Sequence, residues 1–161
     1  MSNENNYAFI DSQNLNLGVR SQGWCLDFSK FRVYLQDKFK VTRAFLFMGY
    51  IPSYKKLYGA LESAGYELIF KPTIRDHNGS VKGNVDAELV LHTMIEYASY
   101  DQAVVVTGDG DFFCLVDYLK SQQKLQRLVV PNRRSCSSLL MSGVFKPYIT
   151  VLDGTREKLE R

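Results

Sequence analysis

The sequence predicts one α/β domain, a three-layer α/β/α sandwich with a mainly parallel central sheet. Short apolar runs typical of buried strands alternate with amphipathic stretches, and the spacers between the runs are long enough for a helix. Spacers of that length favour parallel pairing through right-handed crossovers. With 161 residues, 45% of them apolar, the chain is long enough for one core and short for two. We therefore expect residues 1–161 to form a single domain with its core over residues 7–152.

The first half of the chain should contain three strands and two helices. The strands are predicted by apolar runs over residues 7–10, 41–48 and 66–70. Between the first two runs, Asp27 can cap a helix whose apolar residues recur at helical spacing, namely Phe28, Phe31, Leu35 and Phe39. Between the second and third runs, Ser53 can cap a helix that runs to Ala64 and stops at Gly65.

The second half should continue the alternation of strands and helices. A polar stretch over residues 72–83, with its turn at 76–79, is predicted to be an exposed loop. The remaining predicted elements are a helix over 85–97, a strand over 103–106, a helix over 111–121, a strand over 128–130, a short helix over 137–141 and a last strand over 148–152. The charged tail over 155–161 is predicted to be a frayed helix or the start of further structure.

Composition narrows the class of protein. The chain has 20 basic and 17 acidic residues, and the formal net charge of +3 is too small to establish a polyanionic partner. Cys25, Cys114 and Cys136 are widely spaced, so neither a disulfide framework nor a zinc finger is supported and a reducing, cytoplasmic setting is expected. The polar N-terminus is unlike a signal peptide, and no apolar run approaches the roughly 20 residues that span a bilayer. We expect a soluble protein with no membrane partner.

The most informative stretch is AVVVTGDGDFF over residues 103–113, where a predicted buried strand runs into a small-residue turn that carries Asp109 and Asp111. Asp11 likewise follows the first predicted strand. Asp86 lies in the first turn of a predicted crossover helix, and such a helix begins at the sheet edge where the strands end. Ligands of open α/β sheets bind at that edge. Four carboxylates from three segments can therefore converge there.

Such a cluster of acids needs protons or cations. Two ionised carboxylates about 4 Å apart repel by about 4 kcal/mol at an effective dielectric of about 20. Mg²⁺ or Mn²⁺ is the natural partner, because both prefer oxygen ligands and Mg²⁺ also binds substrate phosphate. The alternative is that each acid acts alone: Asp109 or Asp111 could cap the following helix, and Asp86 could favour the positive end of its own. Capping does not explain why Asp11 should join them.

Other site chemistries fit the sequence less well. His77 and His92 cannot supply the nitrogen-rich shell that zinc prefers. A calcium loop fails because Lys120 stands where the closing Glu is needed, and a dinucleotide fingerprint fails because Phe113 stands where the third Gly belongs. The sequence also contains no G-x-S-x-G elbow and no Walker-type G-K-[ST].

Three blocks of the sequence, FIDSQNL at 9–15, KGNVD at 82–86 and VTGDGDF at 106–112, resemble the signature blocks of the NYN domain within the PIN-like nuclease superfamily, and the bacterial LabA-like branch is the most similar. The resemblance extends over residues 7–152, and the three blocks in order are far more specific than any one of them. Two departures concern the second block. Many members have the shorter KGVD, whereas Asn84 is inserted here, and an acid often found about six residues later is His92 in this chain.

The resemblance implies a PIN-like sheet with strand order 3-2-1-4-5, an acidic pocket that binds Mg²⁺ or Mn²⁺, and cleavage of RNA. By motif position, the metal-binding and catalytic acids would be Asp11, Asp86, Asp109 and Asp111, with Glu88 as a further contributor. Asn14 would orient the first block or touch substrate. The full set expected to contact substrate is Ser12, Asn14, Lys82, Thr107, Arg133, Arg134 and Ser135.

Metal-assisted hydrolysis of a phosphodiester is the implied mechanism, with one ion activating water and another stabilising the leaving oxygen. Because the pocket is acidic, a polyanion can approach only if basic groups flank it. Candidates for that flank are Lys71, Arg75, Lys82, Arg133 and Arg134, although a solvated surface cluster is the competing reading. Unpaired bases of single-stranded RNA could stack on Tyr50, Tyr54 or His77. The sequence does not decide the RNA substrate, the mode of attack or whether the chain forms a homodimer.

Three functions of different classes remain open at this point. A metal-dependent ribonuclease is preferred. An RNA-binding or regulatory module that keeps the fold but cleaves poorly is the second, and the presence of all four acids argues against it. The third is a metal-dependent phosphatase acting on small molecules. Against it stands the sequence Asp11-Ser12-Gln13, where an Asp-x-Asp nucleophile motif would be needed.

Overall fold

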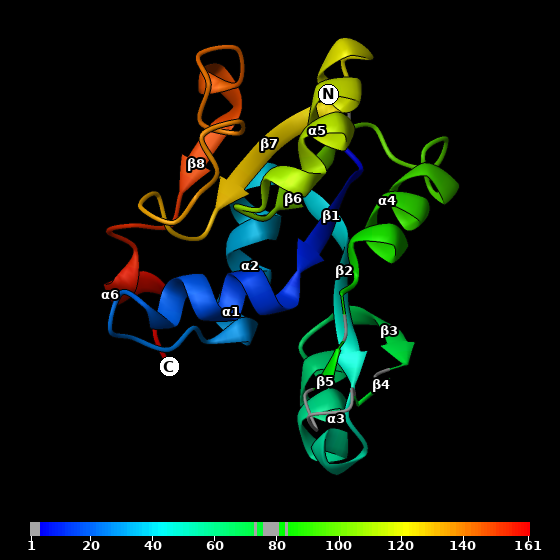
Figure 1. The fold of residues 1–161 in the computed structure, drawn as a ribbon, viewed down its shortest axis with the longest axis vertical. Helices are drawn as coiled ribbons and strands as arrows, with labels where there is room; N and C mark the ends of the chain where they lie inside the picture. The colour runs from blue at the N-terminus through cyan, green and yellow to red at the C-terminus, as the bar shows by residue number, and fades with distance from the viewer. Residues whose placement is uncertain (1–3, 73, 76–80, 83) are drawn as a thin grey trace.

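The computed structural model describes residues 4–72, 74–75, 81–82 and 84–161. Six parallel strands form the central sheet in the order β3-β2-β1-β6-β7-β8 (Figure 1). The strands are β1 (Asn6–Asp11), β2 (Val41–Tyr50), β3 (Tyr66–Pro72), β6 (Ala103–Val106), β7 (Leu125–Val130) and β8 (Ile149–Val151). In chain order the first five long strands are arranged 3-2-1-4-5, which confirms the predicted topology. The sixth predicted strand extends the sheet beyond the fifth.

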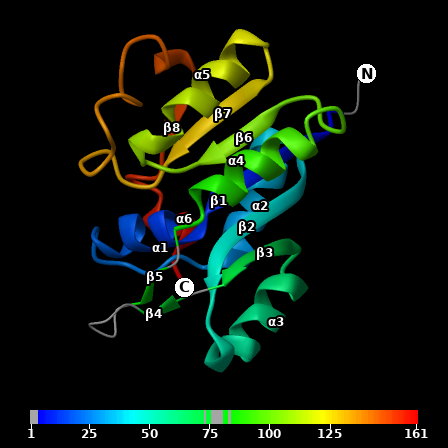
Figure 2. The same cartoon turned by 45° about the vertical axis from the view of Figure 1, so that its right-hand side comes forward.

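Helices cover both faces of the sheet, as expected for a three-layer sandwich (Figure 2). The helices are α1 (Ser12–Arg20), α2 (Phe28–Phe39), α3 (Lys55–Ser63), α4 (Asp86–Ile95), α5 (Phe113–Ser121) and α6 (Arg156–Leu159). Side chains alternate along each strand, so Ala8 and Ile10 of β1 face the core under α1 and α2, whereas Tyr7 and Phe9 face the core under α4 and α5. Burial of both faces explains why the strands are continuous apolar runs.

The helix ends show which capping predictions were correct. Asp27 caps α2, because its carboxylate accepts a hydrogen bond of 3.0 Å from the backbone N–H of Lys30. Ser53 does not cap α3: it lies inside a 3₁₀ turn over Pro52–Tyr54, and no side chain caps the helix that follows. Gly65 has a φ of +104° just past the end of α3, which is the left-handed conformation that favours glycine at a helix stop.

Three segments differ from their prediction. Helix α1 was not predicted, because only Leu15 and Val19 form its buried stripe among polar residues that also favour turns. The predicted helix over 137–141 is an irregular chain of turns. The C-terminal tail is not frayed: α6 packs on α2, and Leu159 is buried in the core between them.

The predicted exposed loop over 72–83 contains a short hairpin. Strands β4 (Ile74–Arg75) and β5 (Val81–Lys82) pair in antiparallel fashion beyond the carboxyl ends of β2 and β3 (Figure 2). The predicted turn at 76–79 lies outside the described residues. Among the described residues, no helix combines the length and the apolar character that crossing a membrane would require.

Candidate active site

Three carboxylates meet at the carboxyl edge of the sheet. Asp11 is the last residue of β1, Asp109 follows β6, and Asp86 is the first residue of α4. One carboxylate oxygen from each lies within 4.8 Å of the others. The expected convergence of acids from three separate segments therefore occurs, since α4 begins at the edge where the parallel strands β1 and β6 end.

Local hydrogen bonds hold each acid in place. Asp11 caps α1 by accepting from the backbone N–H of Asn14 at 3.3 Å, and Asp109 caps the 3₁₀ turn over Gly110–Phe112 by accepting from the N–H of Asp111 at 2.9 Å. The backbone N–H of Asp86 donates to the side-chain oxygen of Asn84 at 2.8 Å. Capping and clustering therefore coexist for Asp11 and Asp109, because each cap uses only one carboxylate oxygen. The inserted Asn84 orients the start of α4.

Two uncharged side chains tie β1 to the turn after β6. The Thr107 hydroxyl donates to Asp11 at 3.4 Å and accepts from the backbone N–H of Asp109 at 3.1 Å. The Asn14 side-chain oxygen accepts from the N–H of Gly108 at 2.8 Å. Thr107 is fully buried, so its side chain supports the acids from below and is not accessible to a substrate.

Asp111, the fourth predicted acid, stands outside the group of three. It is exposed in the 3₁₀ turn after β6, and its carboxyl lies beside that of Asp86 within hydrogen-bonding reach. The turn explains the difference: the backbone N–H of Asp111 is bound to the Asp109 carboxylate, and its own side chain is left at the rim of the cluster.

Burial without a neutralising partner sets the electrostatics of the site. Burial is the largest of the causes that raise the pKa of Asp11 from 3.8 to about 6, and the nearby carboxylates of Asp86 and Asp109 add to it. Hydrogen bonds from Asn14 and Thr107 act in the opposite direction. The pKa of Asp86 is also raised, first by burial and then by Asp109. None of the four ion pairs found among the described residues includes these acids.

The donor set fits a hard divalent cation. The three side chains offer only carboxylate oxygens, the ligand type that Mg²⁺ and Mn²⁺ prefer. Among the described residues, no basic side chain forms an ion pair with them in place of a cation. Glu88, the other acid considered from the sequence, is not a member of the group, and one of its oxygens lies 3.8 Å from the Lys71 amine. His92 packs its ring against Phe47 at 5.7 Å between centroids.

The predicted basic flank is described in part. Arg133, Arg134 and Ser135 are exposed in the loop after β7. Both sides of this segment are anchored: the Asn132 side chain donates to the Gly18 carbonyl of α1 at 3.2 Å, and the Ser137 N–H donates to the Gly108 carbonyl, next to Asp109, at 2.9 Å. His77 lies outside the described residues, as do the side chains of Arg75 and Lys82. Ser12 begins α1 and is half-buried.

Ser137 is a site residue that the sequence analysis missed. Its hydroxyl lies 2.5 Å from the place where a Cβ on Gly110 would stand, so the loop after β7 closes against the turn that carries Asp109. The Ser137 hydroxyl also accepts from the N–H of Leu139 at 3.2 Å. The small residues of the GDGD turn were the available signal, because they indicate a close approach by another segment.

We expect Gly110→Ala to lower the free energy of unfolding by about 1–3 kcal/mol, since the added methyl would meet both the hydroxyl and the Cβ of Ser137. Gly59→Ala on α3 is the matched control. No atom lies within 4 Å of its added methyl, so it should raise that free energy by about 1 kcal/mol through helix propensity. Urea unfolding followed by circular dichroism measures both. A Gly110→Ala protein as stable as the wild type would show that the loop moves aside freely.

Comparison with known proteins places this geometry in a family. The family model described as the NYN domain matches residues 7–142. Over 125 residues, the chain is 26% identical to the low amplitude and bright protein LabA of Synechococcus elongatus. The matched region covers 71% of this chain and 67% of that protein. A crystal structure of a protein of unknown function from Vibrio parahaemolyticus superposes with a TM-score of 0.78 at 22% identity, over 99% of this chain and 97% of the other. At that identity the likeness concerns the fold.

Proposed function

The chain belongs to the NYN domain family, and from that premise we propose that it is a metal-dependent ribonuclease that hydrolyses phosphodiester bonds. The observation that carries the proposal is the group of three carboxylates from three elements, buried in part and without a basic partner among the described residues. Stability alone does not favour such a group, because the burial and mutual repulsion that raise the pKa of Asp11 oppose its charged form. Perturbed acids gathered at the binding edge of an α/β sheet are typical of a functional site.

Asp11, Asp86 and Asp109 would hold Mg²⁺ or Mn²⁺ through carboxylate oxygens. A bound divalent ion supplies positive charge to the phosphate oxygens and lowers the pKa of a bound water. Asp111, exposed beside Asp86, is placed to accept a hydrogen bond from a water at the rim of the site. Its role in this proposal is to orient that water, and the other three acids form the cation site.

Thr107 and Asn14 act in this proposal as positioning residues. The Thr107 hydroxyl joins the Asp11 carboxylate to the backbone of Asp109, and Asn14 joins the start of α1 to Gly108. Together they keep the ends of β1 and β6 at a constant separation, so the two acids keep the spacing that a shared cation requires. Orienting the first block is one of the two roles expected for Asn14, and for the buried Thr107 the positioning role takes the place of the expected substrate contact.

Phosphate contacts are proposed for the segment Arg133-Arg134-Ser135. It is exposed, and its two ends are tied to α1 and to the Gly108 turn. Guanidinium groups suit phosphate oxygens because they can donate two parallel hydrogen bonds. Positive charge here would offset the repulsion between an acidic pocket and a polyanion.

Labelled single-stranded RNA, duplex RNA and single-stranded DNA, incubated with the protein in Mn²⁺, Mg²⁺ or a chelator, test the proposal. We expect RNA cleavage that requires the divalent ion and that Asp109→Asn lowers at least about 100-fold, because several kcal/mol of charge stabilisation are lost. Asp117→Asn, which changes an exposed acid on α5, is the matched control and should cleave normally.

Other outcomes point to the other functions. RNA binding without cleavage by the wild-type protein in either metal would contradict the nuclease proposal and favour a regulatory module. Turnover of small phosphate esters with no cleavage of RNA would favour a phosphatase.

A further inference from the structure

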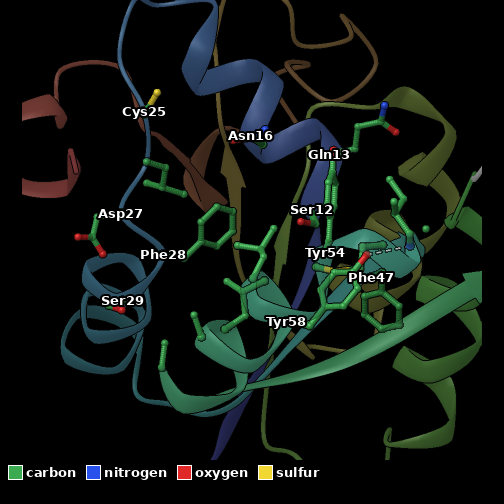
Figure 3. Close-up of a pocket in the computed structure, with 18 of the residues that line it drawn as sticks. Ser12, Gln13, Asn16, Cys25, Asp27, Phe28, Ser29, Phe47, Tyr54 and Tyr58 are labelled. Carbon is green, nitrogen blue, oxygen red and sulfur yellow. Dashed lines mark hydrogen bonds between the residues drawn. The ribbon is translucent and has the colours of Figure 1, made fainter.

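A groove of about 710 Å³ (Figure 3) is lined in part by the sequence neighbours of two of the three acids. Ser12, which follows Asp11, and Val85, which precedes Asp86, both line it. Figure 3 shows α1 with Ser12 and Gln13 along one edge, Phe28 at the start of α2 on a second side, and Tyr54 and Tyr58 on the side of α3. A chain bound at the acids can therefore continue into the groove without leaving the surface.

The lining of the groove is aromatic and apolar with few charges. Tyr54 and Leu57 line it with exposed fractions of 48% and 50%, and the half-buried Phe28 also belongs to it. Such large exposed apolar side chains beside a polar site indicate a surface that binds something. The volume also falls within the range of about 300–1,000 Å³ that is usual for small-ligand pockets.

The few charged side chains that line the groove include more basic than acidic residues. Asp27 is its one acid among the described lining residues, and its carboxylate is already bound to the N–H of Lys30. Arg20 and Arg161 also line the groove and are both exposed. The groove thus offers an apolar interior with positive charge available for phosphate, in contrast to the acidic cluster next to it.

The aromatic wall of the groove is held rigidly. The Tyr58 hydroxyl accepts from the N–H of Ile51 at 2.9 Å, and its buried ring packs against Phe70 at 4.7 Å between centroids. The Tyr54 and Tyr58 rings pack edge to face, with 6.5 Å between their centroids. Tyr54 is therefore a half-exposed ring on a fixed support, which lowers the entropy that a stacking partner must overcome.

We propose that this groove binds the unpaired bases of single-stranded RNA on one side of the scissile phosphate, with Tyr54 as a stacking platform. The inference rests on the proposed ribonuclease function and adds the place where the bases of the substrate bind. Bases in a duplex are paired and stacked, so their faces cannot enter an aromatic groove, whereas bases of a single strand stack readily on aromatic side chains. The amides of Gln13 and Asn16, which also line the groove, can bind base edges.

Thiol protection gives a test within the unmodified chain. Cys25 lines the groove and is exposed, whereas Cys114 is exposed on α5 and does not line it. An oligouridylate at ten times its Kd, added with a chelator so that it stays intact, should slow alkylation of Cys25 about tenfold by mass action and leave Cys114 unchanged. Mass spectrometry of the labelled peptides resolves the two. A blunt RNA duplex at the same concentration should protect neither.

Substitution at Tyr54 gives a second test. Tyr54→Ala should weaken binding of the oligouridylate about 5- to 100-fold in fluorescence anisotropy, the usual range for loss of one base–aromatic stack. Tyr54→Phe keeps the ring and should bind within about twofold of the wild type. Tyr118→Ala is the matched control, because it removes a tyrosine of similar exposure, 43%, from α5.

The outcomes separate this inference from the nuclease proposal. If the wild type cuts RNA while Cys25 stays reactive and Tyr54→Ala binds normally, the groove assignment is wrong and the nuclease stands. If the oligouridylate protects Cys25 but no RNA is cut in either metal, the groove assignment holds and the catalytic proposal fails. Equal protection of Cys25 by duplex RNA, or no binding of RNA at all, would overturn the inference.

Discussion

Asp11→Asn is expected to make the metal-free protein more stable and to abolish its cleavage of RNA. Asparagine keeps the oxygen that caps α1 by accepting from Asn14, so the local structure should be retained. It removes the negative charge that burial, Asp86 and Asp109 all oppose. The same charge is needed to hold a divalent cation, so cleavage should fall at least about 100-fold.

The sign and size of the stability change follow from the Asp11 pKa. Because that pKa is about 6 in the folded protein and ordinarily 3.8, the folded state binds the proton more tightly than the unfolded state. Stability from this group is therefore present at low pH and is lost as pH rises from about 4 to above 6. The full difference corresponds to about 3 kcal/mol, an upper limit for the gain that Asp11→Asn shows at pH 8.

Urea unfolding in a chelator at pH 8 and at pH 4 measures this gain, which should be largest at pH 8 and shrink at pH 4. Asp27→Asn is the matched control, because Asp27 caps α2 in the same way at a distance from the other acids. Its unfolding free energy should stay within about 0.5 kcal/mol of the wild type. An Asp11→Asn protein less stable than the wild type at pH 8 would contradict the electrostatic account of the site.

Mn²⁺ or Mg²⁺ should raise the melting temperature of the wild-type protein, and the effect should be larger at pH 8 than at pH 5. A ligand present at about 100 times its Kd stabilises the folded state by about 2.7 kcal/mol. For a chain of 161 residues this corresponds to about 5–11 °C. The ion stabilises the folded state because it supplies the positive charge that the three carboxylates lack.

The pH dependence of this shift arises from competition between the cation and a proton. At pH 5 most of Asp11 is protonated, because its pKa is about 6, and the cation must displace that proton. At pH 8 the carboxylate is already ionised. Differential scanning fluorimetry over a metal titration at both pH values gives the two affinities.

Ionic strength and specificity need separate controls in that titration. NaCl at the same ionic strength should not reproduce the shift, and Asp11→Asn should reduce it to that of NaCl. A shift that is independent of pH and survives Asp11→Asn would place the cation elsewhere on the protein.

Much of the fold could be predicted because its signals are local. The apolar runs of β1, β2 and β6 show which segments are buried on both faces, and helix-length spacers favour parallel pairing. Asp11 and Asp109 come at the ends of strands, and Asp86 begins a crossover helix. These positions predict that all three acids lie at the carboxyl edge of the sheet. This part of the site follows from topology, since every parallel strand ends at the same edge.

Other features depend on contacts between segments far apart in the chain. Nothing near Ser137 in the sequence indicates that its N–H donates to Gly108, a tertiary contact that joins the loop after β7 to the turn after β6. The predicted helix over 137–141 is a run of turns instead. Asp111 lies in the same block as Asp109, but the 3₁₀ turn separates the two carboxylates. The geometry of a turn is decided by its partners, and residue type alone does not specify it.

The sequence by itself predicted that acids from three segments could meet at one sheet edge, because parallel strands all end at the same edge and crossover helices begin there. Only the tertiary structure decided which acids share a cation-sized space, that Thr107 supports them from a buried position, and that an aromatic groove opens beside them. The physical reason is the distance along the chain over which each kind of interaction acts. Periodicity and capping act over a few residues, whereas a cavity forms where side chains from α1, α2 and α3 fail to fill the space between them.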